Sequence, residues 1–372
     1  MKLTIERAAL LRSLGHVQSV VERRNTIPIL ANVLIEAEEG KLRLTATDMD
    51  LNIIDEVAAD ASETGATTAP AHTLYDIVRK LPDGAQVELS TGGDSGRMTL
   101  RSGRSEFTLA TLPKEDFPAM GGDELPQRFQ LQAAELRDVI DRTRFAISTE
   151  ETRYYLNGIY LHAAEGENGQ VLRAVATDGH RLARFQMPLP TGAADMPPAI
   201  IPRKTVTEVR KLIDETSDPV TLSLSDTRIE FAFDATVLTS KLIDGTFPDY
   251  QRVIPSGNDK TMEVRCKDFA EAVDRVSTIS SEKSRAVKLA VHSGNLTLSA
   301  NSPENGTAVE ELEIDYGGQD IEIGFNSRYL LDIAHQIEGD GAQFVMADAS
   351  SPTIVRDAAD GNALYVLMPM RV

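Results

Sequence analysis

The chain has a single cysteine, Cys266, among its 372 residues. One cysteine cannot form an intramolecular disulfide, and a zinc site built from several thiolates cannot be assembled within one chain. The sequence therefore fits a reducing compartment such as the cytosol.

Long hydrophobic runs are also missing. No stretch of 18 consecutive apolar residues occurs, and the first 20 residues carry scattered charges instead of the apolar core of a signal peptide. We expect a soluble protein that is not exported and does not enter a membrane.

Signatures of metal sites and of common catalytic sites are absent from the sequence. The six histidines are dispersed singly, at His16, His72, His162, His180, His292 and His335. There is no His-x-x-x-His pair, no glycine-rich phosphate loop ending in Gly-Lys-Ser/Thr, and no Gly-x-Ser-x-Gly motif. We therefore expect no metal, no cofactor and no dedicated catalytic centre.

Basic charge is scarce relative to acidic charge. The chain has 38 Lys and Arg against 57 Asp and Glu, a formal net charge of −19. This balance argues against a protein whose whole surface adheres to nucleic acid or to an anionic membrane, but it leaves room for a local basic face.

The sequence does contain an internal repeat. "LRLTATDMDLNI" from Leu42 aligns with "LRAVATDGHRLA" from Leu172, and the Phe-Pro pairs at Phe117 and Phe247 lie the same 130 residues apart. A weaker third copy, "NLTLSANSPENGTAVEEL", places Ala300 a further 124 residues beyond Ala176. Two anchors that agree on one offset indicate duplication, and three copies of this length fill the chain.

Each copy predicts the same order of elements. An amphipathic helix comes first, then alternating strands such as "NVLIEA" and "KLRLTAT", then a second helix and more strands. Gly- and Pro-bearing segments near 119–127 and 246–259 mark the boundaries. The sequence therefore predicts an α+β fold with domains at 1–125, 126–249 and 250–372.

Basic residues recur on the polar sides of the six predicted helices. They are Arg7, Arg12, Arg79, Lys80, Arg137, Arg142, Arg144, Arg203, Lys204, Arg210, Lys211, Lys267 and Arg275. On any one helix the simplest interpretation is a solvated face, because Lys and Arg are good helix formers. Recurrence in all three copies favours a basic surface that lies around a polyanion and makes only weak contacts with it.

The turn "ATDGHRLA" is the stretch that most resembles a catalytic motif. Asp178 and His180 could act as an acid/base pair, but no nucleophile or third orienting group accompanies them. In the first copy the matching positions are Asp48 and Asp50, so an aspartate that caps the turn through its backbone is the simpler interpretation.

The C-terminus "YVLMPMRV" combines a strand pattern with exposed apolar chemistry. Val366, Met368 and Met370 alternate, and Pro369 interrupts any further strand. The end of a core strand is one interpretation, and an adaptable methionine-bearing binding surface is the other.

Taken together, these segments resemble the bacterial DNA polymerase III β subunit, or sliding clamp, over the whole chain. The similar segments are "IPIL" at 27–30, "TRYYLNGIYLH" at 152–162, "ATDGHRLA" at 176–183, "IPRK" at 201–204, "KLIDGTFPDYQRVIP" at 241–255 and "YVLMPMRV" at 365–372.

The resemblance implies three repeated domains of the DNA-clamp (processivity-fold) type and a head-to-tail homodimer. Its six domains would form a ring with helices inside and sheets outside. Such a ring encircles duplex DNA without reading its sequence, tethers the replicative polymerase for processive DNA replication, and docks the clamp loader and repair proteins. The family is a non-catalytic processivity subunit of the DNA polymerase III holoenzyme, without a cofactor, in the bacterial cytoplasm at the replication fork.

The resemblance also implies site residues. A pocket for partner peptides would be formed by Leu156, Thr177, Gly179, His180, Arg181, Leu182, Pro248, Arg252, Val253, Val366, Met368, Pro369, Met370 and Arg371, with His180 and Arg181 as its polar edges. DNA contacts would come from Arg24, Tyr154 and Tyr155, together with Arg137, Arg203 and Lys204 of the basic helices. The ring interface would pair Phe107 and Leu109 with Thr278 and Ile279 of the other chain.

Two other interpretations stay open at this point. One is a hydrolase that uses Asp178 and His180. The other is a monomeric β-rich scaffold protein that forms no ring, which a native mass of one 40.5 kDa chain would indicate.

Overall fold

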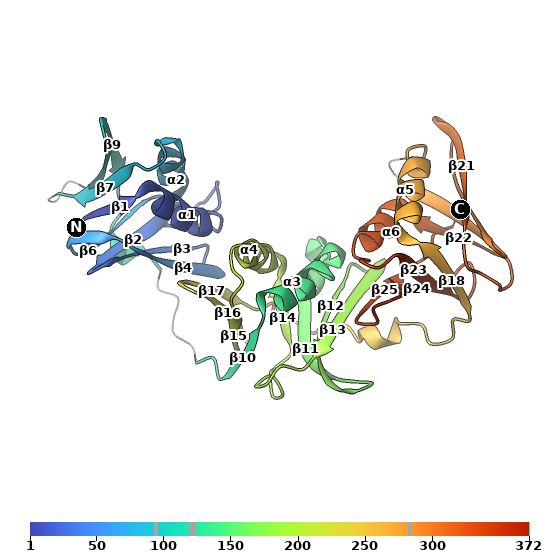
Figure 1. The fold of residues 1–372 in the computed structure, drawn as a ribbon. Helices are drawn as coiled ribbons and strands as arrows, with labels where there is room; N and C mark the ends of the chain where they lie inside the picture. The colour runs from blue at the N-terminus through green and yellow to red at the C-terminus, as the bar shows by residue number, and fades with distance from the viewer. Residues whose placement is uncertain (93–95, 119–123, 282–284, 372) are drawn as a thin grey trace. The chain divides into compact units, whose positions relative to one another are not determined.

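A computed structural model of the chain describes residues 1–92, 96–118, 124–281 and 285–371. The elements follow one order three times: a strand, a helix, four or five strands, a second helix and three strands (Figure 1). The predicted α+β repeat is therefore confirmed as an order of elements. Part of the first predicted boundary segment, residues 119–123, lies outside the described residues.

The first copy comprises β1 (Lys2–Glu6), α1 (Arg7–Gln18), β2 (Asn32–Glu38), β3 (Lys41–Thr47), β4 (Leu51–Ala58), β5 (Asp60–Glu63), β6 (Gly65–Pro70), α2 (Ala71–Lys80), β7 (Gln86–Thr91), β8 (Arg97–Ser102) and β9 (Ser105–Ala110). The second comprises β10 (Gln127–Leu131), α3 (Ala133–Asp141), β11 (Gly158–Gly166), β12 (Gly169–Thr177), β13 (Arg181–Pro188), β14 (Ala199–Pro202), α4 (Arg203–Ile213), β15 (Val220–Leu224), β16 (Arg228–Phe233) and β17 (Thr236–Lys241). The third comprises β18 (Lys260–Arg265), α5 (Cys266–Ser277), β19 (Ala286–His292), β20 (Asn295–Ser302), β21 (Gly306–Glu313), β22 (Ile321–Asn326), α6 (Ser327–Ala334), β23 (Gly341–Met346), β24 (Thr353–Asp357) and β25 (Ala363–Leu367).

The helices form where the apolar residues repeat at helical spacing. In α1, for example, Leu10, Leu14 and Val17 are buried on one face. The apolar pattern continues past the helix ends, however: Val21 and Ile147 lie beyond α1 and α3 and are still buried. The apolar spacing therefore predicts longer helices than the structure has, because the loop that follows each helix also packs against the core.

Two of the four sheets cross the boundaries between copies. One eight-stranded sheet has the order β10-β15-β16-β17-β4-β3-β2-β6, so that β17 of the second copy pairs with β4 of the first. The other has the order β14-β11-β12-β13-β25-β24-β23-β18, where β13 of the second copy pairs with β25 of the third. Both pairings are antiparallel, with Leu238 opposite Ile53 and Val366 opposite Leu182.

These shared sheets divide the chain into two compact units. The first holds residues 1–136, 191–197 and 204–242, and the second holds 137–190, 198–203 and 243–372. The division runs through the second copy, because each outer copy shares a sheet with one part of it.

Within each unit a helix pair lies against two sheets. In the first unit, α1 packs on α2 and contacts β1 of the sheet β5-β1-β7-β8-β9 and β3 and β4 of the eight-stranded sheet. In the second unit, α5 packs on α6 and contacts β18 of the other eight-stranded sheet and three strands of the sheet β21-β20-β19-β22. The core of each outer copy thus lies between its helix pair and two sheets.

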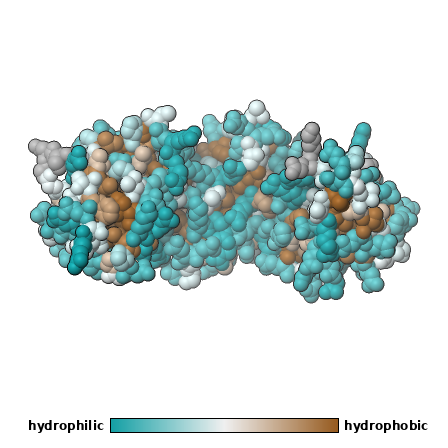
Figure 2. All heavy atoms as spheres, turned by 90° about the horizontal axis from the view of Figure 1, so that it is seen from above, coloured by the Kyte–Doolittle hydropathy of each residue, from teal (hydrophilic) through white to brown (hydrophobic). Residues whose placement is uncertain are grey.

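The face of the molecule shown in Figure 2 is mainly polar. Hydrophilic residues cover most of the face seen in Figure 2, and apolar residues gather there in smaller areas. Among the described residues, no helix is both long and apolar enough to cross a membrane.

Candidate functional site

The turn at residues 177–181 joins β12 to β13 and is held by its own aspartate. The Oδ1 atom of Asp178 accepts hydrogen bonds from the backbone N–H groups of His180 (2.9 Å) and Arg181 (3.1 Å). Gly179 has φ +89°, in the left-handed region, and a Cβ there would lie 2.6 Å from a guanidinium nitrogen of Arg153. The aspartate caps the turn, and the glycine adopts its left-handed conformation without the strain that a side chain would add.

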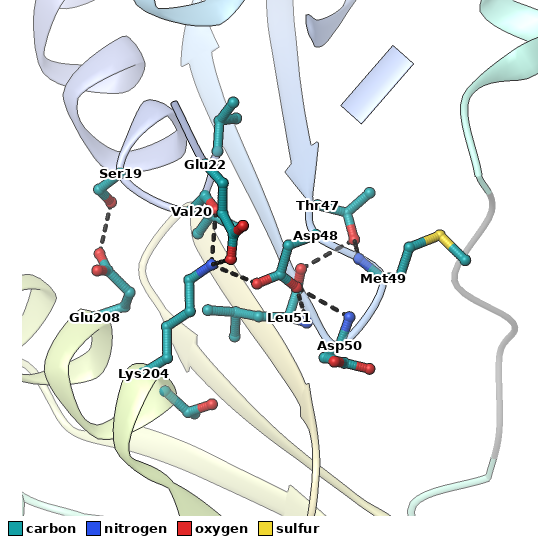
Figure 3. Close-up of polar contacts among 12 residues, drawn as sticks. Ser19, Val20, Glu22, Thr47, Asp48, Met49, Asp50, Leu51, Lys204 and Glu208 are labelled. Carbon is teal, nitrogen blue, oxygen red and sulfur yellow. Dashed lines mark hydrogen bonds and ion pairs between the residues drawn. The ribbon is translucent and has the colours of Figure 1, made fainter. Parts of the chain in front are cut away.

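The matching turn of the first copy has the same hydrogen bonds. Oδ1 of Asp48 accepts from the backbone N–H groups of Asp50 (2.9 Å) and Leu51 (2.7 Å), as Figure 3 shows. Met49 stands at the position of Gly179 and also has a positive φ, +81°. The turn-capping interpretation of these aspartates agrees with both geometries.

Arg181 extends from the turn into the protein rather than into solvent. Its side chain is only 8% exposed; the guanidinium donates to Asp178 (3.1 Å), to Asp332 of α6 (2.5 Å) and to the carbonyl of Phe145 (2.6 Å). It also lies over the rings of Phe145 and Tyr329, at 5.2 and 4.3 Å from their centroids. Arg181 thus ties the turn to the third copy, and its contacts also occupy the Asp178 carboxylate.

Several predicted pocket residues meet beside this turn. Leu156, Leu182 and Val366 belong to one buried apolar cluster that also contains Phe247 and Tyr250. The cluster forms because β13 pairs with β25, which puts Val366 opposite Leu182.

Around the cluster the predicted pocket residues are more exposed. Val253 and Met368 rank among the exposed large apolar side chains, at 44% and 37%. The backbone N–H of Met368 donates to the carbonyl of His180 (3.0 Å), which fixes the C-terminal segment beside the turn. Arg252 is exposed and pairs with Asp249. The arrangement offers apolar surface with polar edges.

The C-terminal segment continues along the third copy. The backbone N–H of Met370 donates to the carbonyl of Gly324 in β22 (2.7 Å). A groove of about 780 Å³ adjoins this segment, lined by Met370 and Arg371 and by small residues of the sheet such as Ser299 and Ala308.

Of the residues predicted to contact DNA, Arg24 and Arg203 are exposed and Arg137 is half-buried. Tyr154 is 54% exposed, and its ring meets that of Tyr155 edge-on at 5.8 Å between centroids. Tyr155 packs against the apolar cluster. The packing interpretation thus holds for Tyr155, and DNA contact by Tyr154 stays a prediction.

Lys204, another residue predicted to contact DNA, interacts with acidic groups within the protein. Its ammonium lies 2.5 Å from Asp48, 3.1 Å from the carbonyl of Val20 and 3.5 Å from Glu22 (Figure 3). Its main electrostatic partners are therefore carboxylates of the first copy.

Pairing with acids is common among the predicted basic helix residues. At least nine of them have a carboxylate within 4 Å: Arg7, Arg12, Arg79, Arg142, Arg144, Lys204, Arg210, Lys211 and Arg275. Their attraction for a polyanion is weaker than the count of basic residues indicates, because the neighbouring carboxylates oppose it.

The residues predicted for the ring interface lie at element ends and edges. Phe107 and Leu109 are on β9, the last strand of its sheet, and Thr278 and Ile279 follow the end of α5. Leu109 is 9% exposed, whereas Thr278 is exposed. The strand β21 also lies at the end of its sheet.

Cys266 begins α5 and is buried, with its thiol donating to the carbonyl of Ala334 (3.4 Å). Burial raises the pKa of this thiol to about 11, so that the reactive thiolate is scarce near neutral pH.

Sequence reasoning missed residues that complete the site. Asp332, Tyr329 and Phe145 surround Arg181, and Asp332 lies 151 residues from it in the chain. No local motif signals such a contact, whereas Arg153 stands directly before the two tyrosines in "TRYYLNG" and could have been included.

Three helix-and-sheet repeats, with apolar surface beside a capped turn, are the features of a DNA clamp. Family models of the DNA polymerase III β subunit match the chain throughout: the N-terminal domain at residues 1–121, the central domain at 130–249 and the C-terminal domain at 251–371. The chain therefore belongs to the DNA polymerase III β-subunit family, the bacterial sliding clamps.

Individual relatives agree with this assignment. The chain is 57% identical to the beta sliding clamp of Caulobacter vibrioides over 372 residues and 40% identical to that of Escherichia coli K12 over 373 residues, with complete coverage of both proteins in each case. It also resembles the crystal structure of the C. crescentus clamp with PEG bound to a putative beta-motif tethering region (TM-score 0.98, 57% identity, 100% and 99% coverage). A clamp from Bartonella birtlesii bound to griselimycin gives a TM-score of 0.97, with 51% identity and full coverage of both chains.

These relatives favour the sliding-clamp interpretation and give no support to the hydrolase alternative. The family is a non-catalytic processivity factor that works with DNA and the polymerase.

Proposed function

We propose that two copies of this chain form a head-to-tail ring that encircles duplex DNA and holds the replicative polymerase on its template. The chain itself has no catalytic role in this proposal. The domains end near residues 125 and 249, and the protein acts in the bacterial cytoplasm at the replication fork.

The observation that carries this proposal is the threefold sequence of elements, in which each outer copy has a strand at the edge of a sheet. The strands β9 and β21 each lie at the end of a sheet, where unpaired backbone groups can join a strand of another chain. Phe107 and Leu109 on β9, and Thr278 and Ile279 after α5, would form the side-chain contacts of that interface.

The mixed charges on the helices suit a ring that slides. Paired carboxylates limit how strongly the basic residues attract phosphates, so few contacts would resist movement along DNA. Arg24, Tyr154, Arg137 and Arg203 are the proposed contacts, with Tyr155 and Lys204 in supporting positions.

We further propose that the polymerase subunit, the clamp loader and other partners bind the surface beside the 177–181 turn through short peptide motifs. The buried cluster around Leu156, Leu182 and Val366 would support the apolar side chains of the peptide, and Val253 and Met368 would cover them. Burial of such side chains contributes about 25 cal/mol per Å².

A fluorescence titration of a labelled Gln-Leu-x-Leu-Phe peptide tests the partner surface. We expect micromolar binding to the full-length protein, and loss of binding by a version that ends at Leu367. That truncation leaves β25 complete and removes Met368 to Arg371 from beside the turn.

Matched single substitutions refine the test. Met368→Ser should weaken binding at least several-fold, and Ile27→Ser, which alters a similarly exposed apolar side chain in the other unit, should leave it unchanged. Absence of binding by the intact protein would contradict the proposed partner site.

A further inference from the structure

A polar contact connects helices α1 and α4, which belong to different copies within the first unit. We call it the α1–α4 junction. Its members form hydrogen bonds or ion pairs between the copies: Arg12 with Glu215 (3.0 Å), His16 with Glu215 (3.0 Å), Ser19 with Glu208 (2.6 Å) and Lys204 with the Val20 carbonyl (3.1 Å). Figure 3 shows the Ser19 and Lys204 side of this junction.

His16 is the member whose charge changes near neutral pH. Its Nδ1 lies 2.9 Å from Oδ1 of Asp55, and its Nε2 lies 3.0 Å from Oε2 of Glu215. The His16 side chain is 10% exposed and that of Asp55 is 7% exposed. Asp55 also accepts hydrogen bonds from the hydroxyls of Ser13 and Thr236, so its orientation is fixed independently of His16.

The carboxylates of Asp55 and Glu215 determine which protonation state of His16 is favoured. A neutral imidazole has one N–H and can donate to only one of them, whereas an imidazolium donates to both. In the neutral form, one ring nitrogen would direct its lone pair at a carboxylate oxygen, which is repulsive.

Charged groups from four segments of the first unit share a cavity with His16. They are Arg12 on α1, Asp55 and Glu56 on β4, Glu215 after α4, and Asp234 in the turn between β16 and β17, all lining a cavity of about 180 Å³. Acidic groups outnumber basic ones there, and the cavity gives water a route to the imidazole.

We propose that His16 is a protonation switch for the α1–α4 junction. Charged His16 links Glu215 of the second copy to Asp55 of the first, and loss of its proton leaves the Asp55 hydrogen bond in place but breaks the link to Glu215. Arg12 still holds Glu215, so deprotonation loosens the end of α4 without separating the copies.

The pKa values agree with this assignment. Burial alone lowers the pKa of His16, but its hydrogen bonds to Asp55 and Glu215 outweigh burial and raise the pKa above its ordinary value of 6.5. Burial raises the pKa values of Asp55 and Glu215, but hydrogen bonds from His16 and their other donors outweigh it, so both lie below their ordinary values of 3.8 and 4.5.

The direction of the pH effect follows from linkage. Stabilisation from His16 is complete below its ordinary pKa of 6.5 and is lost as the pH rises through the raised, folded-state pKa. Stabilisation from the two carboxylates is present above 3.8 and 4.5 and is lost as the pH falls through their lowered values. The junction is therefore tightest between pH 4.5 and 6.5.

Two measurements on the full-length protein test the switch. The imidazole signals are titrated by NMR in the wild type, with the His16 signal identified from His16→Gln. We expect its midpoint above 6.5, shifted downward in Glu215→Gln. Hydrogen exchange of the segment 204–217, corrected for the intrinsic rate, should be several-fold faster at about pH 8.5 than at about pH 6.

His72→Gln is the matched control. The His72 ring contacts Gln18 and the Val21 carbonyl within the first copy, so this variant should keep the wild-type pH dependence of segment 204–217, whereas His16→Gln should abolish it. A His16 midpoint at or below 6.5, or an unchanged pH dependence in His16→Gln, would overturn the proposal. If His16→Gln does not fold, the imidazole signal that is displaced in Glu215→Gln identifies His16, because Glu215 contacts His16 directly, and its wild-type midpoint then decides.

Discussion

At the residue scale, the side chains around the 177–181 turn stabilise its conformation through contacts within the protein itself. The Asp178 carboxylate and the Arg181 guanidinium engage neighbouring groups, and Gly179 adopts a backbone conformation that most residues avoid. The presence of Asp178 and Arg181 beside Gly179 is therefore explained by the structure of the turn, without a catalytic role.

Gly179→Ala tests that explanation. The substitution forces a Cβ into the left-handed region and against Arg153, so we expect the free energy of unfolding to fall by about 1–2 kcal/mol in denaturant titrations. Gly257→Ala is the control, since Gly257 has no close neighbours and lies outside that region; it should change stability by less than about 0.5 kcal/mol. Equal stabilities of the two variants would contradict the strained turn.

At the element scale, the joints between copies are pairs of neighbouring strands. The strands β4 and β17 form one joint, with Leu238 fully buried opposite Ile53. Side-chain packing and backbone hydrogen bonds thus both cross the boundary between copies.

Leu238→Ala should weaken the first joint. A cavity at this buried position costs about 2–5 kcal/mol of unfolding free energy, measurable in denaturant. Val309→Ala, at an exposed strand position, should cost less than about 0.5 kcal/mol. If the two variants have the same free energy of unfolding, side-chain packing at the joint contributes less to stability than the burial of Leu238 indicates.

The local elements could be predicted from the sequence, but the joints could not. "KLRLTAT" alternates and coincides with β3, and Leu10, Leu14 and Val17 have the spacing of one face of α1. The partner of β4, in contrast, lies nearly two hundred residues away, and alternation does not specify which edge a strand will join. For the same reason the sequence did not predict the Arg181–Asp332 contact, although it did predict that Asp178 caps its turn.

At the scale of the whole molecule, β9 and β21, which lie at sheet ends among the described residues, favour assembly. Long unpaired edges invite association, and closing a ring satisfies them.

Phe107→Asp tests this assembly. A charge on β9 should prevent the proposed interface, so native mass spectrometry should give a single 40.5 kDa chain, against twice that mass for the wild type. Ile27→Asp, at an exposed apolar position that belongs to neither edge strand, should remain a dimer. A dimeric Phe107→Asp variant would place the interface elsewhere, and a monomeric wild type would contradict the ring.

The strand pairs that join the copies also bear on how the three could diverge. A ladder between main chains requires no particular side chain beyond an alternating pattern, so substitutions accumulate in each copy without breaking the connection between them. Met49 and Gly179, in the turns that precede the joining strands β4 and β13, likewise differ in residue type but share a positive φ. The fold can therefore persist after sequence similarity among the three copies is no longer recognisable, and each copy can acquire a separate function.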